Sequence, residues 1–416
     1  MIEVPATRRT LPLGMTATRF LREYWQRKPL LVRGAFPAFA DPLTPNDLAG
    51  LAGEEFALSR LITRLPRDRW RLRNGPFGAA DFAKQPKRDW TLLVQDVDKS
   101  DADVRMLLNG FDFLPSWRID DIMVSYAVDG GSVGAHVDQY DVFLLQGLGC
   151  RRWQISTDAA APKEFREDAD IKLLRTFTPT HEWLLQPGDM LYLPPGVPHH
   201  GVAVGECLTY SIGMRAPSFA EMLVDFAETF AETLPENLRF GDPDLAPATN
   251  RGEIDEAAFG RVARAMPWLR LDDGLRDSGR ETFRRERGTD GCSGRVESSM
   301  LRTWFARFIT RYRSAYTAMP RTRRITDAQF NRAFAAGAEA VRNPWSRAAW
   351  FRSARGAMLV VAGTEQECSI PLAQRVCSHA TVPLDGVRSR KDRDALRSLI
   401  DLGHVTLHAS KRRSRK

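Results

Sequence analysis

Short β-rich runs, most of them ended by glycine or proline, fill the chain from Trp90 to about Arg215. Valine, isoleucine, leucine, tyrosine and tryptophan dominate these runs, and turn residues separate them. Spacing of this kind is typical of a β-sandwich or barrel, because βαβ units would place long helical patterns between the strands. The clearest runs are 90–98, 121–131, 136–149, 151–156, 190–196 and 207–214. The sequence therefore predicts a domain built mainly from β-strands.

The pattern becomes helical after Pro217. A stripe of apolar residues at spacings of three and four predicts a helix with a core or helix-pairing face: Phe219, Met222, Leu223, Phe226, Phe230 and Leu234. A basic amphipathic helix follows from 301, and a helix, a turn at Gly403 and a short strand close the chain. We predict a β domain with N-terminal helical elements (1–215), a helical region (216–310), a winged-helix-like basic domain (311–410) and a basic tail (411–416).

Charge is distributed unevenly along the 416 residues. The net charge is +8, but residues 301–416 carry 23 Lys and Arg against 8 Asp and Glu, which leaves −7 on residues 1–300. A basic segment of this size indicates either an anionic partner such as RNA or simply a solvated basic surface. Both interpretations remain open from the sequence.

The chain lacks the sequence signs of secretion, membrane insertion or disulfide bonding. No apolar run approaches the roughly 20 residues that span a bilayer, and no apolar segment follows the basic residues near the N-terminus. The five cysteines are odd in number and include no C-x-x-C pair, which argues against a disulfide framework or a zinc ribbon. We therefore expect a cytoplasmic protein with no membrane partner.

Two glycine-flanked β elements contain three of the seven histidines. His136 and Asp138 are two residues apart, so on a strand their side chains would point to one face. One imidazole and one carboxylate are two ligands of the facial triad that holds Fe(II) in oxygenases. The second element ends in His199 and His200, which face opposite ways on an extended segment, so only one of them can be the third ligand.

Arg151 lies on a strand whose inward face is identified by two large apolar residues, Trp153 and Ile155. A buried guanidinium without a partner is costly, and a carboxylate held by two hydrogen bonds is a fitting ligand for it. Arg151 could alternatively pair with an acidic residue of the chain. Ser125, on the strand before the glycine turn, is a candidate hydroxyl donor to the same carboxylate.

The segments 120–155, 187–201 and 210–218 resemble the JmjC-type bacterial ribosomal oxygenases, members of the cupin superfamily, as do the shorter segments 20–36 and 113–123. The resemblance covers residues 15–220 closely and the remainder only in architecture. It implies a double-stranded β-helix, a helical dimerisation region and a winged-helix domain. It places the iron ligands on His136, Asp138 and His199, and the arginine that binds the cosubstrate on Arg151.

The activity implied by this resemblance is hydroxylation of an arginine side chain in a large-subunit ribosomal protein. Fe(II) would be the cofactor, with 2-oxoglutarate and O2 as cosubstrates, and a homodimer would be the working form. The basic C-terminal half could contact ribosomal RNA. Two alternatives remain: a catalytically silent JmjC scaffold that binds ribosomal components, and a metal cupin that does not use 2-oxoglutarate.

Overall fold

The computed structural model describes residues 2–237, 298–311, 318–378 and 381–409, with short pieces at 239, 241–243, 245, 258–260 and 262. Two compact units are distinguished. One comprises Met1–Ser218 together with Phe305–Lys416, and the other comprises Phe219–Trp304. The predicted tail at 411–416 and most of the segment between 238 and 297 lie outside the described residues.

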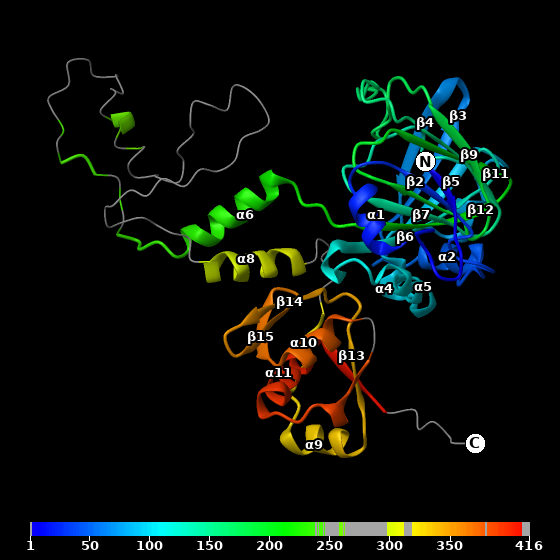
Figure 1. Ribbon diagram of the computed structural model, residues 1–416. Coiled ribbons are helices and arrows are strands. Elements are labelled where there is room, and N and C mark those ends of the chain that lie inside the picture. The colour runs from blue at the N-terminus through cyan, green and yellow to red at the C-terminus, as the bar shows by residue number, and fades with distance from the viewer. Residues whose placement is uncertain are drawn as a thin grey trace, which may run out of the picture. The chain divides into compact units, whose positions relative to one another are not determined.

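The N-terminal part of the first unit contains a large and a small β-sheet (Figure 1). The large sheet has the order β1-β2-β10-β7-β12-β6-β5-β3-β4. Its strands are β1 (Glu3–Pro5), β2 (Leu30–Arg33), β3 (Ser59–Leu65), β4 (Arg69–Asn74), β5 (Trp90–Val94), β6 (Ile119–Ala127), β7 (Val142–Gln146), β10 (Met190–Leu193) and β12 (Cys207–Met214). The small sheet has the order β11-β8-β9, with β8 (Cys150–Ile155), β9 (His181–Leu185) and β11 (His199–Val204).

A shared apolar core joins the two sheets. Leu144 and Leu191 of the large sheet belong to one buried cluster with Trp153, Ile155 and Leu185 of the small sheet. Short helices flank the large sheet: α1 (Ala17–Glu23), α2 (Pro45–Leu51), α3 (Ala79–Ala83), α4 (Val97–Ser100) and α5 (Ala102–Met106). The sheets face each other without closing into a single hydrogen-bonded barrel, as in a jelly roll. The predicted β domain is confirmed.

The C-terminal part of the same unit is a small α/β domain with its own core. Its helices are α9 (Asp327–Ala335), α10 (Ile370–Cys377) and α11 (Arg390–Asp401). One sheet has the order β17-β13-β18, from Val382–Pro383, Glu339–Arg342 and Val405–His408, and the other has the order β14-β15-β16, from Ala348–Ser353, Gly356–Val361 and Thr364–Cys368. The predicted turn at Gly403 has φ +76°, which suits glycine, and it leads into β18.

The second unit contains α6 (Phe219–Ala231) and the first half of α8 (Ser298–Thr310). These two helices pair through an aromatic contact, because the Phe226 and Trp304 ring centroids are 5.0 Å apart at 79°. Trp304 Nε1 also donates a hydrogen bond to Asp225 Oδ1 at 2.8 Å. The apolar stripe predicted after Pro217 is therefore only partly packed in α6. Phe226 contacts Trp304, whereas the Phe219 and Leu223 side chains remain 88% and 67% exposed. No membrane-spanning helix is found in the described part of the chain.

Candidate active site

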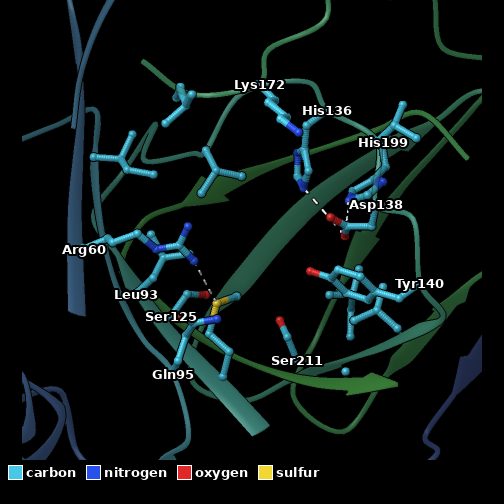
Figure 2. Close-up of a pocket in the computed structure, with 18 of the residues that line it drawn as sticks. Arg60, Leu93, Gln95, Ser125, His136, Asp138, Tyr140, Lys172, His199 and Ser211 are labelled. Carbon is cyan, nitrogen blue, oxygen red and sulfur yellow. Dashed lines mark hydrogen bonds and ion pairs between the residues drawn. The ribbon is translucent and has the colours of Figure 1, made fainter. Parts of the chain in front are cut away.

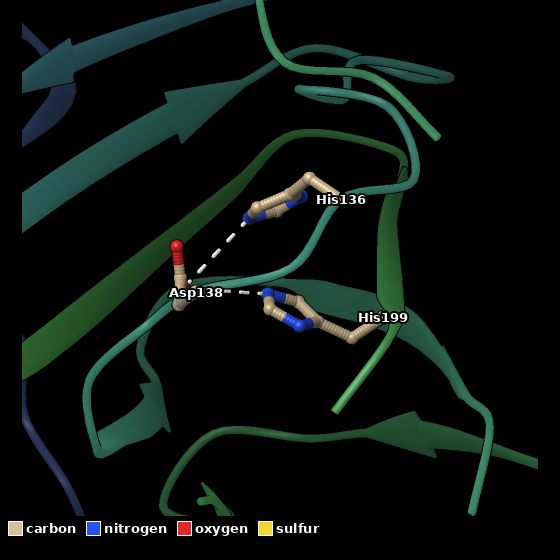
Figure 3. Close-up of side chains that lie close together, drawn as sticks. All are labelled: His136, Asp138 and His199. Atoms are coloured by element: carbon tan, nitrogen blue, oxygen red, sulfur yellow. Dashed lines mark ion pairs between the residues drawn. The ribbon is translucent and has the colours of Figure 1, made fainter. Parts of the chain in front are cut away.

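His136, Asp138 and His199 lie close together in the β domain (Figure 3). The Nε2 atoms of His136 and His199 are 3.9 Å and 3.6 Å from Asp138 Oδ2, and one ligand atom from each residue lies within 4.8 Å of the others. Two imidazoles and one carboxylate in this arrangement form the donor set of a facial triad for a divalent transition metal.

The backbone around the cluster differs from the sequence prediction in one respect. His136 and Asp138 were expected on a strand, but they lie in the segment between β6 and β7. An isolated antiparallel bridge replaces the strand, since His136 and His199 exchange two backbone N–H···O hydrogen bonds of 3.0 Å. This bridge holds the two imidazoles next to each other, with ring centroids 4.1 Å apart.

Gly134 allows the segment before His136 to pack closely against the loop between β8 and β9. Its φ is +80°, and a Cβ atom there would lie 2.4 Å from Leu173 Cδ2. The loop between β8 and β9 can therefore pack over this turn, where Leu174 N–H donates to Ala135 O at 2.8 Å. Any larger residue at Gly134 would strain the backbone at this positive φ and push the Leu173 side chain aside.

Both imidazoles present Nε2 to Asp138 because their other nitrogens are engaged. His136 Nδ1 lies 3.0 Å from Gly134 O, and His199 Nδ1 lies 2.9 Å from Val197 O. An Nδ1–H donated to a carbonyl leaves the Nε2 lone pair free for a metal. Burial, together with the charge of nearby His136, lowers the pKa of His199 to about 4. His199 is therefore neutral near pH 7, as a metal ligand must be.

The adjacent histidine points elsewhere. The His200 ring faces Phe177, with centroids 6.1 Å apart at 85°, and His200 is not part of the cluster. The alternation of side chains along β11 therefore brings only His199 to the cluster, in agreement with the sequence argument.

Arg151 lines a cavity of about 470 Å³ that the cluster also lines. Its side chain comes from β8 and is only 4% exposed, next to Trp153 on the same face. Arg151 Nε and Nη2 are buried without a hydrogen-bond partner in the described part of the chain. The alternative in which Arg151 pairs with an acidic residue of the protein is therefore not observed. Two orphaned donors in a cavity indicate an anionic ligand.

Ser125 of β6 lines the same cavity and is 3% exposed. Its hydroxyl makes one long hydrogen bond, 3.5 Å to Thr209 O, and so retains capacity for a ligand. Tyr140 also lines the cavity, and burial of its hydroxyl, with Asp138 and Asp121 nearby, raises its pKa. Asp141, which follows Tyr140, does not line the cavity: it is fully buried and accepts a hydrogen bond from Tyr192 Oη at 2.6 Å.

Several charged residues of the cavity were not predicted from the sequence. Arg60 and Lys172 are two of them (Figure 2), and Asp121 is a third. Burial, with Asp96 and Asp120 nearby, raises the pKa of Asp121 to about 7. Asp121 and Ser125 are four residues apart on β6, so side-chain alternation, which we used for Arg151, would have found Asp121 from the sequence. Lys172 comes from the β8–β9 loop, for which the sequence offered no comparable pattern.

Comparison with protein families agrees with this geometry. Residues 106–222 match the JmjC domain, and residues 295–407 match the ROXA-like winged helix. The chain therefore resembles proteins that combine a JmjC domain with a ROXA-like winged helix. The fold class predicted from the sequence is confirmed, as is the resemblance to the JmjC-type bacterial ribosomal oxygenases.

Curated relatives and solved structures of this kind are also similar to the chain. A probable ribosomal oxygenase of Haemophilus influenzae is 37% identical over 63% of this chain and 65% of its own length. The ribosomal protein uL16 3-hydroxylase of Escherichia coli is 37% identical over 56% of this chain and 62% of its own. These alignments span slightly less than two thirds of either relative.

A solved structure of Escherichia coli YcfD matches 95% of this chain and 99% of its own, with 27% identity and a TM-score of 0.78. YcfD in complex with cobalt and 2-oxoglutarate matches over the same shares, with 27% identity and a TM-score of 0.75. A related chain therefore binds a divalent metal and this cosubstrate on a fold similar to the one described above.

The proposed ligand set makes a prediction about the two adjacent histidines. His199→Ala should lower the affinity for Co(II) strongly, because it removes one of three donors, whereas His200→Ala should leave that affinity near the wild-type value. Titration of the visible absorption of Co(II) measures both without any turnover. Loss of Co(II) from His200→Ala, with binding retained by His199→Ala, would show that the third ligand is His200.

Proposed function

We propose that this chain is an Fe(II)- and 2-oxoglutarate-dependent oxygenase that hydroxylates an arginine side chain of a large-subunit ribosomal protein. The observation that carries the proposal is the position of the unpartnered Arg151 in the cavity lined by His136, Asp138 and His199. A metal-ligand set and an anion anchor in one cavity favour a chelating carboxylate cosubstrate over a cupin that binds metal alone.

The residues of the cavity fit the proposed cofactor and cosubstrate. One carboxylate and two imidazoles suit Fe(II) and would leave coordination positions for other ligands. Arg151 supplies two buried donors for the distal carboxylate of 2-oxoglutarate, and Ser125 can add a hydroxyl. The 470 Å³ cavity is in the range of small-molecule sites. The complex of YcfD with cobalt and 2-oxoglutarate supports the same assignment.

Iron bound by the cluster would supply the activation of O2 that hydroxylation of an unactivated C–H bond requires. The side chains of this protein would bind and orient the reactants. Arg151 and Ser125 would hold one end of the cosubstrate, and the loop containing Leu173 would exclude water from the His136 side of the cavity. None of these side chains needs to act as a nucleophile, because the chain contributes geometry and charge.

A cationic substrate side chain fits the part of the cavity lining that contains Asp121. Asp121 is ionised only in part near neutral pH, because burial and neighbouring carboxylates raise its pKa to about 7. A guanidinium beside it would favour the ionised form and gain a charge-assisted hydrogen bond. Tyr140 and Met123 line the same cavity and would be available to pack against the plane of the guanidinium. The name of the Escherichia coli relative supports a ribosomal protein as the substrate.

Two measurements test the proposal. Purified protein with Fe(II), O2 and 2-oxoglutarate should form succinate, and a substrate peptide should increase the rate. Intact masses of ribosomal proteins from a strain that lacks the gene should show one large-subunit protein lighter by one oxygen atom, and tandem mass spectrometry should locate the change on an arginine. An unchanged set of masses, with no succinate formed, would leave the silent scaffold as the better description.

The proposed function also implies a location and partners for the protein. A ribosomal protein substrate would place the enzyme in the cytoplasm, and the basic C-terminal half could contact ribosomal RNA there. We also propose a homodimer formed through the helical region. Its support is the exposed apolar surface of α6, which Phe219, Leu223 and Val224 form at 88%, 67% and 57% exposure.

If the dimer forms through the exposed apolar surface of α6, a charge placed on that surface should disrupt it. Leu223→Asp should convert a dimer into a monomer, because a carboxylate on that apolar surface would be buried in the interface. Leu58→Asp makes the same substitution at an exposed leucine outside α6, in the β domain, and should stay dimeric. Phe226 is a poor choice for this test, since it packs against Trp304 within the chain. Sedimentation at micromolar concentration decides, and a monomeric wild type would exclude the dimer.

A further inference from the structure

Four arginines surround a hollow of about 310 Å³ between α9 and the start of α11 in the winged-helix domain. Arg390, Arg393 and Arg397 project from α11, and Arg388 lies just before it. The guanidinium of a fifth residue, Arg375 of α10, lies against Gly386 in the segment that leads to α11. This hollow is far from the cavity residues in the sequence, and the proposed hydroxylation does not use it.

Positive charge in the hollow exceeds the negative charge available to neutralise it. Two carboxylates, Asp327 and Asp394, also line the hollow. Arg397 pairs with Asp327, and the exposed pair of Arg390 with Asp394 is long at 3.8 Å. Among the described residues, Arg388 and Arg393 make no ion pair. A long exposed pair contributes little, so the Arg388 and Arg390 guanidinium groups are available to a bound anion. Arg393 Nη2 donates a hydrogen bond to Asn331 Oδ1 and keeps its other donors.

Aromatic rings hold two of the arginines in place. The Arg393 guanidinium carbon lies 4.7 Å from the Phe334 ring centroid and 5.6 Å from that of Phe330. The Arg397 guanidinium carbon lies 5.9 Å from the Phe330 centroid. A guanidinium stacked on a ring keeps its donors in one plane and loses less side-chain entropy when it binds an anion.

We propose that the hollow between α9 and α11 binds phosphate groups of an RNA backbone. Arg390, Arg393 and Arg397 follow one side of α11 over about 10 Å, since an α-helix rises about 1.5 Å per residue. A series of planar guanidinium groups along such a line suits successive phosphates, which Arg binds through two parallel hydrogen bonds. The surplus of +15 on residues 301–416 would add long-range attraction. Only the choice of RNA over another polyanion rests on the proposed ribosomal function.

Fluorescence anisotropy of a short labelled RNA hairpin, titrated with the full-length protein at several salt concentrations, tests this site. Arg388→Glu/Arg390→Glu alters two exposed positions that contribute little to the core. The matched control is Arg8→Glu/Arg9→Glu, which makes the same charge change on exposed residues of the β domain. We expect the first variant to lose at least about tenfold in affinity and about two units of the salt slope. The control should keep nearly all of the wild-type affinity.

Equal losses in the two variants would mean that only net charge matters, and would overturn the site, as would unchanged binding by Arg388→Glu/Arg390→Glu. Tighter binding of a labelled poly-glutamate peptide than of the RNA would overturn the choice of RNA in favour of an acidic protein. Circular dichroism would check the fold of each variant. Because no 2-oxoglutarate is present, the result is independent of hydroxylation: an enzyme that forms succinate but does not bind RNA would lose this inference alone.

Discussion

Asp138→Ala is expected to abolish turnover of 2-oxoglutarate while leaving the fold intact, and His136→Ala is expected to do the same. Asp138 is the only carboxylate of the cluster, and its Oδ2 atom lies within 4 Å of both imidazole Nε2 atoms. Loss of a residue that merely supports a metal ligand typically costs about 10–100-fold in affinity or activity. Loss of a ligand itself should cost more, since the two imidazoles that remain would hold Fe(II) weakly.

Asp170→Ala is the matched control for this prediction. Asp170 is an exposed carboxylate that lines the same cavity but does not belong to the cluster. Co(II) titration, succinate formation at saturating iron and circular dichroism would be measured for all three variants. Succinate formation at the wild-type rate by Asp138→Ala would remove the cluster from the proposed mechanism. Loss of Co(II) from Asp170→Ala as well would indicate a diffuse acidic site.

The residue types in the sequence predicted which side chains meet in the cluster more accurately than the spacing predicted the backbone that carries them. Spacing alone suggested a strand that carries His136 and Asp138 on one face. Both residues instead lie in a glycine-rich segment, in which a β-bridge joins His136 to His199. Their convergence thus depends on a contact between positions more than sixty residues apart. Residue type and the presence of a second histidine element remained good indicators, because metal ligation needs those side chains whatever the backbone around them.

Side-chain alternation along a strand predicted the inward-facing Arg151, and the same alternation applies to Asp121. On β8, two large apolar neighbours identified the inward face, and Arg151 is indeed 4% exposed. On β6 the same alternation places Asp121 and Met123 with Ser125, but an acidic residue on an inward face contradicts a purely apolar expectation. The residues that break the core pattern line the cavity, as is common at functional sites.

The packing of the helical region and that of the winged helix were harder to predict from the sequence, for different reasons. The apolar stripe after Pro217 predicted α6 well, but not that Phe226 would pack against Trp304, almost eighty residues further along the chain. The basic character of the C-terminal segment is plain in the composition. The hollow depends on how α9, α10 and α11 pack on one core, which brings Phe330 of α9 under two arginines of α11. Composition cannot specify such packing.

Arg151→Ala is expected to raise the KM for 2-oxoglutarate by roughly 30- to 150-fold, because a charge-assisted pair in a closed site contributes about 2–3 kcal/mol. Co(II) affinity should change little, since Arg151 is not a ligand. The KM of Arg151→Lys for 2-oxoglutarate should lie between those of the wild type and Arg151→Ala, because an ammonium keeps the charge but cannot reproduce two parallel hydrogen bonds. Ser125→Ala should have a smaller effect, as it removes one neutral donor.

Arg152→Ala provides the matched control, because it removes the same kind of side chain from the next position on β8. Arg152 points away from the cavity, with a side chain 53% exposed and 3.4 Å from Glu182. It should leave the KM for 2-oxoglutarate unchanged. A KM that stays at the wild-type value in Arg151→Ala would show that its buried guanidinium serves the fold and not the cosubstrate. If both variants changed equally, the effect would come from the charge of β8 as a whole, and the anchor for 2-oxoglutarate would have to be sought at Arg60 or Lys172, the other cations of the cavity.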